Sequence, residues 1–132
     1  MSAADYSKAL LAIVIFREAR GEGEAGMTAV GHVIANRCFQ WSKTWHDVIL
    51  GINQFSSMSI HGDANDIVWP PLNDSVFDLA EAVYGGFSKD PTGGSLYYAN
   101  ESTMTSGWYQ RNVIESPEHP VLVVIGKQVF RR

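Results

Sequence analysis

The sequence predicts an α+β fold that is mainly helical, with a small β-hairpin or sheet toward the C-terminus. Apolar residues at helical spacing fill much of the first half of the chain. A largely β-branched run, Val121–Ile125, lies near the end and is followed by a Gly126-Lys127 turn, which is typical of a hairpin. The 132 residues, of which 45% are hydrophobic, suffice for a single domain over residues 1–132 with a buried core.

Three helices are expected in the N-terminal part. Ala and Leu dominate the first half of Tyr6–Arg17, a segment of helical length. In Gly26–Arg37, apolar side chains recur at helical spacing, and the small residues among them allow close approach of a neighbour. A short helix around Trp45–Leu50 is expected to stop at Gly51.

A long irregular segment and a fourth helix make up the middle of the chain. Polar and aromatic residues fill Asn53–Asn73 without a regular period, and a segment of this length inside a compact domain is usually functional. Asp74 is a favourable N-cap for a helix over Ser75–Tyr84, which Gly85-Gly86 ends.

Turns and short strands are expected in the C-terminal third. Asp90–Gly94 has the composition of a turn, and Ser95–Asn100 is predicted to form a short strand. Together with Val121–Ile125 and Val129–Phe130, this strand accounts for the predicted hairpin or sheet.

The composition argues against several classes of protein. Ten basic and fourteen acidic residues give a net charge of −4, whereas a nucleic-acid-binding protein carries a basic patch. Cys38 is the only cysteine, which rules out an intrachain disulfide. Beside Phe39, it is expected to be a small core residue.

The N-terminus resembles neither a signal peptide nor a membrane span. The apolar run Ala9–Phe16 is too short to cross a bilayer, and it lacks both a charged region before it and a small-residue cleavage site after it. We therefore expect a protein made in the cytoplasm without a signal peptide and without membrane insertion. A substrate outside the cell would then require release or export by another factor.

The segment Arg17–Glu22 directly follows the most apolar run of the chain. An apolar environment disfavours the charged form of a carboxyl group, and a carboxylic acid that keeps its proton can protonate a leaving oxygen. The partial negative charge of a helix C-terminus, and Glu22 one turn further on, favour a protonated Glu18. The flanking arginines lower the pKa of Glu18, so the sequence does not decide whether this pKa is raised or lowered overall. The structural alternative is a helix that stops at Gly21 with solvated charges in its last turn.

Four blocks in a fixed order carry a family resemblance. They are Glu18-Ala19-Arg20-Gly21-Glu22 with a helix from Gly26 to Ala35-Asn36-Arg37, then Gln54-Phe55-Ser56, then Thr92-Gly93-Gly94-Ser95-Leu96-Tyr97-Tyr98-Ala99-Asn100, and finally Ile125-Gly126 with Val129-Phe130. This pattern resembles the SleB-like cell-wall hydrolases, the family of spore cortex-lytic enzymes and some phage lysins. It differs at two positions: Gln128 stands where the family has a histidine, and Arg131 where it has an aromatic residue.

The resemblance implies a lysozyme-like fold and cleavage of the peptidoglycan glycan strand between N-acetylmuramic acid and N-acetylglucosamine. It implies that Glu18 is the single catalytic acid, at the end of the first helix. In a lytic transglycosylase, one Glu protonates the glycosidic oxygen and then acts as a base, while the sugar's C6 hydroxyl closes a 1,6-anhydro ring. Peptidoglycan is then the partner of the catalytic domain. The domain is expected to be a monomer without cofactor or metal, in a phage endolysin or a spore-cortex-type lysin.

Several polar residues of these blocks are predicted to bind substrate. Gln54 and Ser56 carry amide and hydroxyl groups suited to an amino sugar. Along a strand, Tyr98 and Asn100 share one face and Tyr97 points the other way. One face is expected to line the cleft and the other to pack, and the sequence does not say which. Phe55 and the four tryptophans are assigned to packing or anchoring before sugar stacking.

Glu22 has two possible roles in the sequence. It either orients the substrate or an attacking group, or braces the Gly21-Gly23 turn. A hydrolytic muramidase, the alternative outcome, requires a second carboxylate, for which Glu22, Asp63 and Asp66 are available.

Other classes fit less well. His32, His46, His61 and His119 have no metal-ligand spacing, which argues against a zinc amidase. No nucleophile elbow or Cys/His context supports a serine or cysteine hydrolase. A non-catalytic glycan-binding module is the remaining alternative, and the presence of Glu18 in its motif argues against it.

Overall fold

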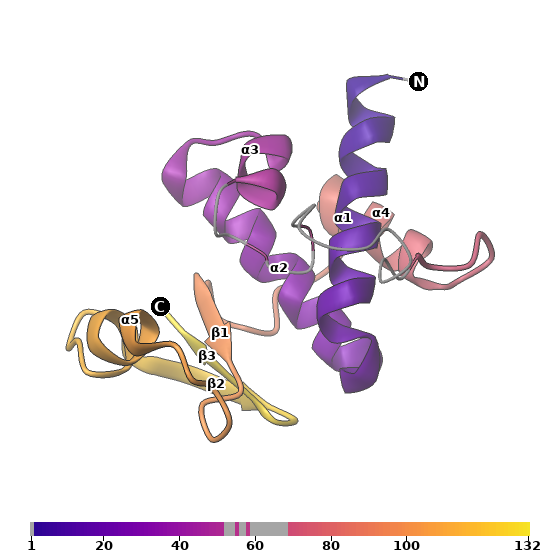
Figure 1. The fold of residues 1–132 in the computed structure, drawn as a ribbon. Helices are drawn as coiled ribbons and strands as arrows, with labels where there is room; N and C mark the ends of the chain where they lie inside the picture. The colour runs from indigo at the N-terminus through magenta and orange to yellow at the C-terminus, as the bar shows by residue number, and fades with distance from the viewer. Residues whose placement is uncertain (1, 52–54, 56–57, 59–68) are drawn as a thin grey trace.

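The computed structural model describes residues 2–51, 55, 58 and 69–132, and its elements are mainly helical with a three-stranded antiparallel sheet. In chain order they are α1 (Ala3–Ala19), the 3-10 helix η1 (Arg20–Glu22), α2 (Gly23–Trp41), α3 (Trp45–Leu50), α4 (Val76–Gly85), β1 (Tyr97–Ala99), α5 (Gly107–Tyr109), the π-helix η4 (Gln110–Ile114), β2 (Val121–Ile125) and β3 (Gln128–Arg131). Helices α1 to α4 lie together, and the sheet lies with α5 on the other side of α2 (Figure 1). The predicted α+β, mainly helical class with a small C-terminal sheet is confirmed.

Helix α1 begins before the predicted start because Ser2 forms a capping box. The Ser2 hydroxyl accepts a hydrogen bond from the Asp5 backbone N–H, and the Asp5 carboxylate accepts one from the Ser2 N–H. Its buried face, which includes Leu11 and Ile15 at no exposure, packs on α2 and α4. The helix thereby runs from this cap to Ala19 and carries Glu18 in its last turn.

Helix α2 is the central element of the fold. It packs against α1, α3 and α4 and also contacts β1 and β2. One glycine in it permits a close approach: a Cβ at Gly26 would lie 2.4 Å from the Glu22 Cβ. The helix continues one turn past the predicted end at Arg37 and stops where Ser42 adopts a left-handed conformation. This extra turn places Trp41 beside the sheet half of the molecule.

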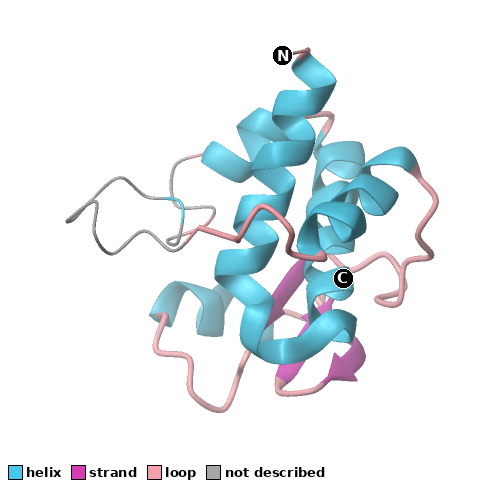
Figure 2. Ribbon diagram, turned by 90° about the vertical axis from the view of Figure 1, so that its right-hand side faces the viewer, coloured by secondary structure: helices cyan, strands magenta, loops and turns pink. Residues whose placement is uncertain are grey.

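The sheet has the strand order β1-β3-β2, with both pairings antiparallel. Gly126 has a φ of 60° in the β2–β3 turn, a conformation that favours glycine. Figure 2 shows the strands gathered at one end of the helical body. Phe130 of β3 is fully buried against Ala29 and Val33 of α2, so one strand residue anchors the sheet to the central helix.

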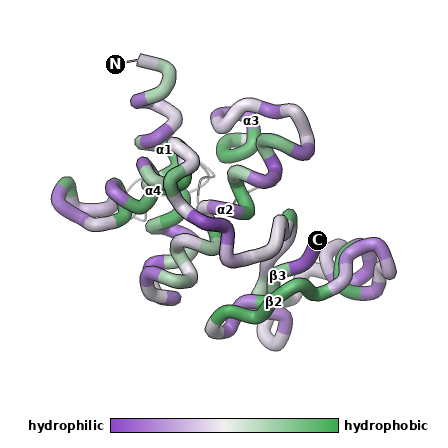
Figure 3. The backbone as a smooth tube through the Cα atoms, turned by 180° about the vertical axis from the view of Figure 1, so that it is seen from behind, coloured by the Kyte–Doolittle hydropathy of each residue, from purple (hydrophilic) through white to green (hydrophobic). Residues whose placement is uncertain are grey.

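The outer strand β2 keeps an apolar sequence although part of it faces solvent. Its hydrophobic colour continues along its length in Figure 3, and Val121 and Val124 are 48% and 57% exposed. The run of apolar residues therefore predicted a strand correctly, whereas the burial of that strand is partial.

The sequence did not predict the helical segment α5–η4. The Ser106 hydroxyl accepts a hydrogen bond from the Tyr109 N–H at its start, and Val113 is fully buried. The segment is short and has no regular apolar period, so its helicity depends on this cap and on burial of one side chain.

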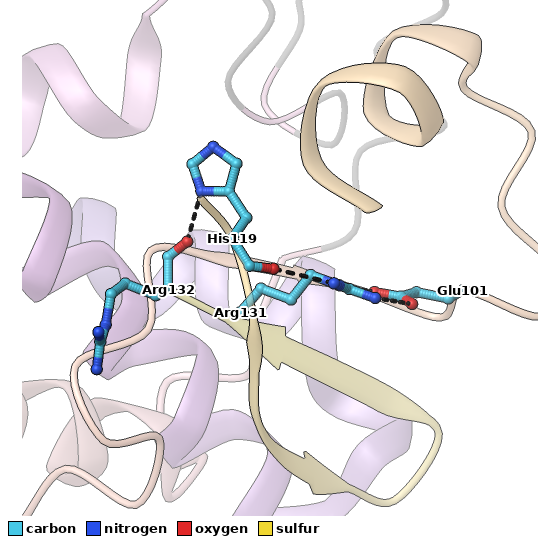
Figure 4. Close-up of polar contacts among 4 residues, drawn as sticks. All are labelled: Glu101, His119, Arg131 and Arg132. Atoms are coloured by element: carbon cyan, nitrogen blue, oxygen red, sulfur yellow. Dashed lines mark hydrogen bonds and ion pairs between the residues drawn. The ribbon is translucent and has the colours of Figure 1, made fainter. Parts of the chain in front are cut away.

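A bidentate ion pair joins β3 to the loop that precedes α5. Arg131 Nε and Nη2 donate hydrogen bonds to the Glu101 carboxylate at 2.6 and 2.9 Å, and Nη1 donates to the His119 carbonyl at 2.9 Å (Figure 4). The hydrogen bond with Glu101 raises the pKa of Arg131. Arg131 thus links the residues before and after α5–η4.

None of the described helices combines the length and the apolar character that a membrane crossing requires.

Candidate active site

A cleft of about 750 Å³ lies where the helices meet the sheet. Its lining comes from α1, α2, β1 and the α5 segment, with one residue from the long connection after α3. The described residues that line it are Glu18, Arg37, Trp41, Phe55, Tyr97, Tyr98, Ser106, Trp108 and Tyr109. Aromatic rings therefore form most of its wall, around one carboxyl and one guanidinium group.

Glu18 is the only carboxylate among these described lining residues. It is half-buried in the last turn of α1. The Tyr98 hydroxyl donates a hydrogen bond to Glu18 Oε1 at 2.9 Å across a separation of 80 residues. One carboxyl oxygen of Glu18 is thereby held in place by the sheet.

Tyr98 is itself held rigidly. Its ring stacks on Phe130 with a centroid separation of 5.9 Å. Burial, followed by the charge of Glu18, raises the pKa of Tyr98 well above its usual value. The phenol therefore keeps its proton near neutral pH and can donate its hydrogen bond to Glu18.

Tyr97 also lines the cleft, so the expectation that only one face of this strand does so is wrong. Its ring contacts His119 at 4.8 Å and Tyr109 at 6.5 Å between centroids. Because β1 is an edge strand, a cleft along its free edge is accessible from both of its faces.

The other predicted binding residues do not gather in the described cleft lining. Asn100 instead accepts hydrogen bonds in the turn after β1, from Ser102 at its side chain and from Met104 at its carbonyl. Glu22 Oε1 accepts a hydrogen bond from Gln128 Nε2 at 3.4 Å, which joins η1 to β3. Gln54 and Ser56 lie outside the described residues.

Sequence reasoning missed six residues of the cleft wall as site residues. These are Arg37, Trp41, Phe55, Ser106, Trp108 and Tyr109. The sequence did contain a signal for Arg37: it lies on the apolar face of its helix, where a charged residue is rare unless it is paired or functional. Burial raises the pKa of Tyr109 to about 12, so this phenol is also neutral.

The end of α2 is tied to the segment that leads into β1. Asn36 Nδ2 donates to Asp90 Oδ2 and to the Ser95 carbonyl, each at 3.0 Å, and Arg37 Nε donates to the Leu96 carbonyl at 2.7 Å. The Asn36-Arg37 and Thr92–Asn100 blocks of the sequence thus meet in the structure. Their hydrogen bonds fix the position of Tyr97 and Tyr98 relative to α2.

Asp90 organises this junction. Its Oδ1 accepts hydrogen bonds from the Thr92 N–H and hydroxyl at 2.8 and 2.7 Å, and its Oδ2 accepts from the Gly94 N–H and from Asn36. Burial raises the pKa of Asp90, but the hydrogen bonds from Thr92, Asn36 and Gly94 outweigh it and hold the pKa below the usual 3.8.

Asp90→Asn is expected to destabilise the fold by about 1–3 kcal/mol at pH 7, because an amide NH₂ at the Oδ2 position would face two donors. Since the folded pKa is depressed, the ionised carboxylate stabilises the fold above pH 3.8, and this contribution is lost as the pH falls through the folded value. The stability difference from the wild type should therefore shrink in urea unfolding below pH 3.8. Glu118→Gln, at an exposed carboxylate, is the control. An equal difference at pH 7 and pH 2.5 would contradict the prediction.

The metal and thiol alternatives find no support among the described residues. Among them, no group of three or more His, Cys, Asp or Glu side chains is placed to hold a metal ion. Burial raises the pKa of the Cys38 thiol to about 11, and this half-buried side chain packs against the core as expected. A thiol with this pKa is not a nucleophile near neutral pH.

Comparison with known proteins relates the chain to a family of cell wall hydrolases. A model of the cell wall hydrolase family matches residues 21–130. Spore cortex-lytic enzymes of Oceanobacillus iheyensis and Halalkalibacterium halodurans are 33% and 34% identical over 92% of the chain. The chain spans 40% and 33% of the lengths of these relatives.

Two solved structures share the fold. The catalytic domain of the Bacillus cereus SleB protein is 29% identical, with a TM-score of 0.74, and the match covers 97% of this chain and 91% of that one. The catalytic domain of a germination-specific lytic transglycosylase, SleB from Bacillus anthracis, is 29% identical with a TM-score of 0.72, over 100% of this chain and 97% of that one. The resemblance noted in the four sequence blocks is confirmed, and the chain belongs to the cell wall hydrolase family.

Proposed function

We propose that this domain cleaves the glycan strand of peptidoglycan between N-acetylmuramic acid and N-acetylglucosamine as a lytic transglycosylase. The observation that carries the proposal is the position of Glu18, the one carboxylate among the described residues of the cleft, fixed by Tyr98 at 2.9 Å. The similarity to a lytic transglycosylase catalytic domain supports the same reaction.

Glu18 acts first as the general acid. Its Oε2 proton passes to the glycosidic oxygen as the bond from C1 of the muramic acid to that oxygen breaks, and the bonding electron pair leaves with the oxygen. Tyr98 holds Oε1 during this step, so the proton is delivered from a fixed direction. The N-acetylglucosamine then leaves with a free 4-hydroxyl group.

Glu18 acts next as the general base. Its carboxylate accepts the proton of the muramic acid C6 hydroxyl as O6 attacks C1, which forms the 1,6-anhydro ring and returns Glu18 to its protonated state. No water is consumed. The attacking hydroxyl belongs to the same sugar, and this replaces a bimolecular step by an intramolecular one.

The reaction outcome is tested by mass spectrometry of digested peptidoglycan. We expect muramyl ends in the 1,6-anhydro form, each lighter by one water than the reducing end that hydrolysis gives. Products with only reducing-end muramic acid would make the domain a muramidase. The second carboxylate would then have to come from Glu22, Asp63 or Asp66, of which Glu22 is described and does not line the described cleft.

Trp108 is the aromatic residue of the cleft best placed to stack on a sugar ring. Its side chain is 58% exposed, whereas Arg37 already lies over the rings of Trp41, Phe55 and Tyr97. Trp108→Ala is expected to weaken wall binding and raise KM about 5–30-fold, for a loss of about 1–2 kcal/mol, with a smaller effect on kcat.

The matched control for this variant is Trp69→Ala. Trp69 is 60% exposed but is not among the described lining residues. Its loss should leave KM within about twofold of the wild type. Equal effects of the two substitutions on KM would argue against a sugar platform at Trp108.

A further inference from the structure

Arg37 is a buried cation at the wall of the cleft. Its side chain is anchored on α2 and only 8% exposed. Burial lowers the pKa of Arg37, yet a guanidinium remains charged at any pH of interest. A buried charge is costly unless an opposite charge and hydrogen bonds compensate it.

The described part of the chain supplies little compensation. Arg37 Nε donates to the Leu96 carbonyl, but neither Nη nitrogen has a hydrogen-bond partner among the described residues, and no described carboxylate lies within ion-pair distance. The charge instead rests against three aromatic rings, with the guanidinium carbon 5.4 Å from the centroids of Trp41 and Phe55 and 5.8 Å from that of Tyr97.

This arrangement holds a planar donor group in a fixed orientation while two nitrogens remain available. The rings and the Leu96 carbonyl restrict rotation of the guanidinium, so little conformational entropy is left to lose on binding. Two parallel N–H donors match the two oxygens of a carboxylate. Glu18 lines the same cleft, so one glycan can reach both Arg37 and Glu18.

We propose that Arg37 binds a carboxylate of the glycan substrate and so selects glycans that carry acidic groups. The inference rests on the proposed function and names a feature of its substrate. Peptidoglycan offers carboxylates of two origins: the lactyl group of a muramic acid without a peptide, and the side chains and terminus of the stem peptide.

The test uses purified cell-wall sacculi with and without carbodiimide amidation by methylamine, which removes the negative charge of their carboxyl groups. Wild-type protein is expected to digest amidated sacculi at least about tenfold more slowly, as for the loss of a charge-assisted hydrogen bond. Arg37→Gln should lose a similar factor on native sacculi and change less than about twofold on amidation. Arg37→Lys should keep part of the preference.

Non-specific charge effects predict the opposite result, namely that amidation of the sacculi speeds digestion. The protein has a net charge of −4, so amidation of an acidic wall reduces repulsion and by itself favours binding. The matched control is Arg132→Gln at an exposed arginine, which should preserve the full preference for native sacculi.

A binding experiment separates this proposal from the reaction. Glu18→Gln protein, with and without Arg37→Gln, is sedimented with native and amidated sacculi, and thermal unfolding verifies that each variant is folded. We expect amidation to weaken binding only when Arg37 is present. Sacculi stripped of stem peptides by an amidase identify the origin of the carboxylate: a preference that persists on them assigns the lactyl group, and one that disappears assigns the peptide.

Two results would overturn the proposal: wild-type protein indifferent to amidation, or Arg37→Gln protein that binds native sacculi as tightly as its parent. A wild type that binds with the expected preference but cuts no glycan would instead refute the proposed function alone.

Discussion

Glu18→Gln is expected to lower the rate of wall lysis by at least ~10²–10⁴-fold while the protein stays folded. The amide is nearly isosteric with the carboxyl group, and its oxygen can still accept the hydrogen bond from Tyr98. It has no acidic proton for the glycosidic oxygen and cannot act as a base afterwards. The decrease in turbidity of a sacculus suspension measures the rate, and near-ultraviolet circular dichroism verifies the fold.

Glu24→Gln is the matched control for this loss. Glu24 is an exposed carboxylate in the first turn of α2, near Glu18 in the sequence but not among the described residues of the cleft. Its replacement should leave lysis within about twofold of the wild type. A folded Glu18→Gln protein that lyses walls at a comparable rate would remove Glu18 from the mechanism.

Phe130→Ala is expected to reduce the free energy of unfolding by about 3–5 kcal/mol, the usual cost of truncating a buried phenylalanine. Phe130 is fully buried, packs on Ala29 and Val33 of α2, and stacks on Tyr98. Domains of this size are stable by only about 5–15 kcal/mol, so the variant should unfold at a much lower urea concentration. The loss of the ring also removes the support behind the hydroxyl that holds Glu18.

Val124→Ala tests whether burial is the cause. Val124 lies on β2 beside β3 and is 57% exposed, so its truncation should cost well under 1 kcal/mol. The loss in free energy of unfolding for Phe130→Leu should lie between those of Val124→Ala and Phe130→Ala. Similar urea midpoints for Phe130→Ala and the wild type would show that this residue does not anchor the sheet.

The sequence predicted the helices and strands that have a strong local pattern. Trp45–Leu50 and Val121–Ile125 have the predicted bounds, because an N-cap or a turn delimits each of them. The ends of α1 and α2 differ because the Ser2–Asp5 capping box and the left-handed Ser42 add a turn. Segment α5–η4 was missed because its sequence has no periodic apolar pattern. Its one fully buried side chain is Val113, and that burial depends on the tertiary fold.

Residues of the candidate site could be predicted only where they belong to one of the sequence blocks. Glu18 and Tyr98 could be named from their blocks, but the hydrogen bond that joins them spans 80 residues and follows from the packing of both α1 and β1 against α2. The sequence gives the alternation of Tyr97 and Tyr98, but not that the strand is an edge strand. Trp108 and Tyr109 lie on the segment that was not foreseen, so their place in the cleft could not be foreseen either.

The strand order of the sheet determines when the cleft is completed as the chain is synthesised. Strand β1, which carries Tyr98, pairs with β3, and Phe130 of β3 supports the Tyr98 ring. A ribosome produces Glu18 more than a hundred residues before β3, so until β3 has been made Glu18 exists without its hydrogen-bond donor in place. The order of synthesis therefore makes the pairing of β1 with β3 the step that completes the cleft.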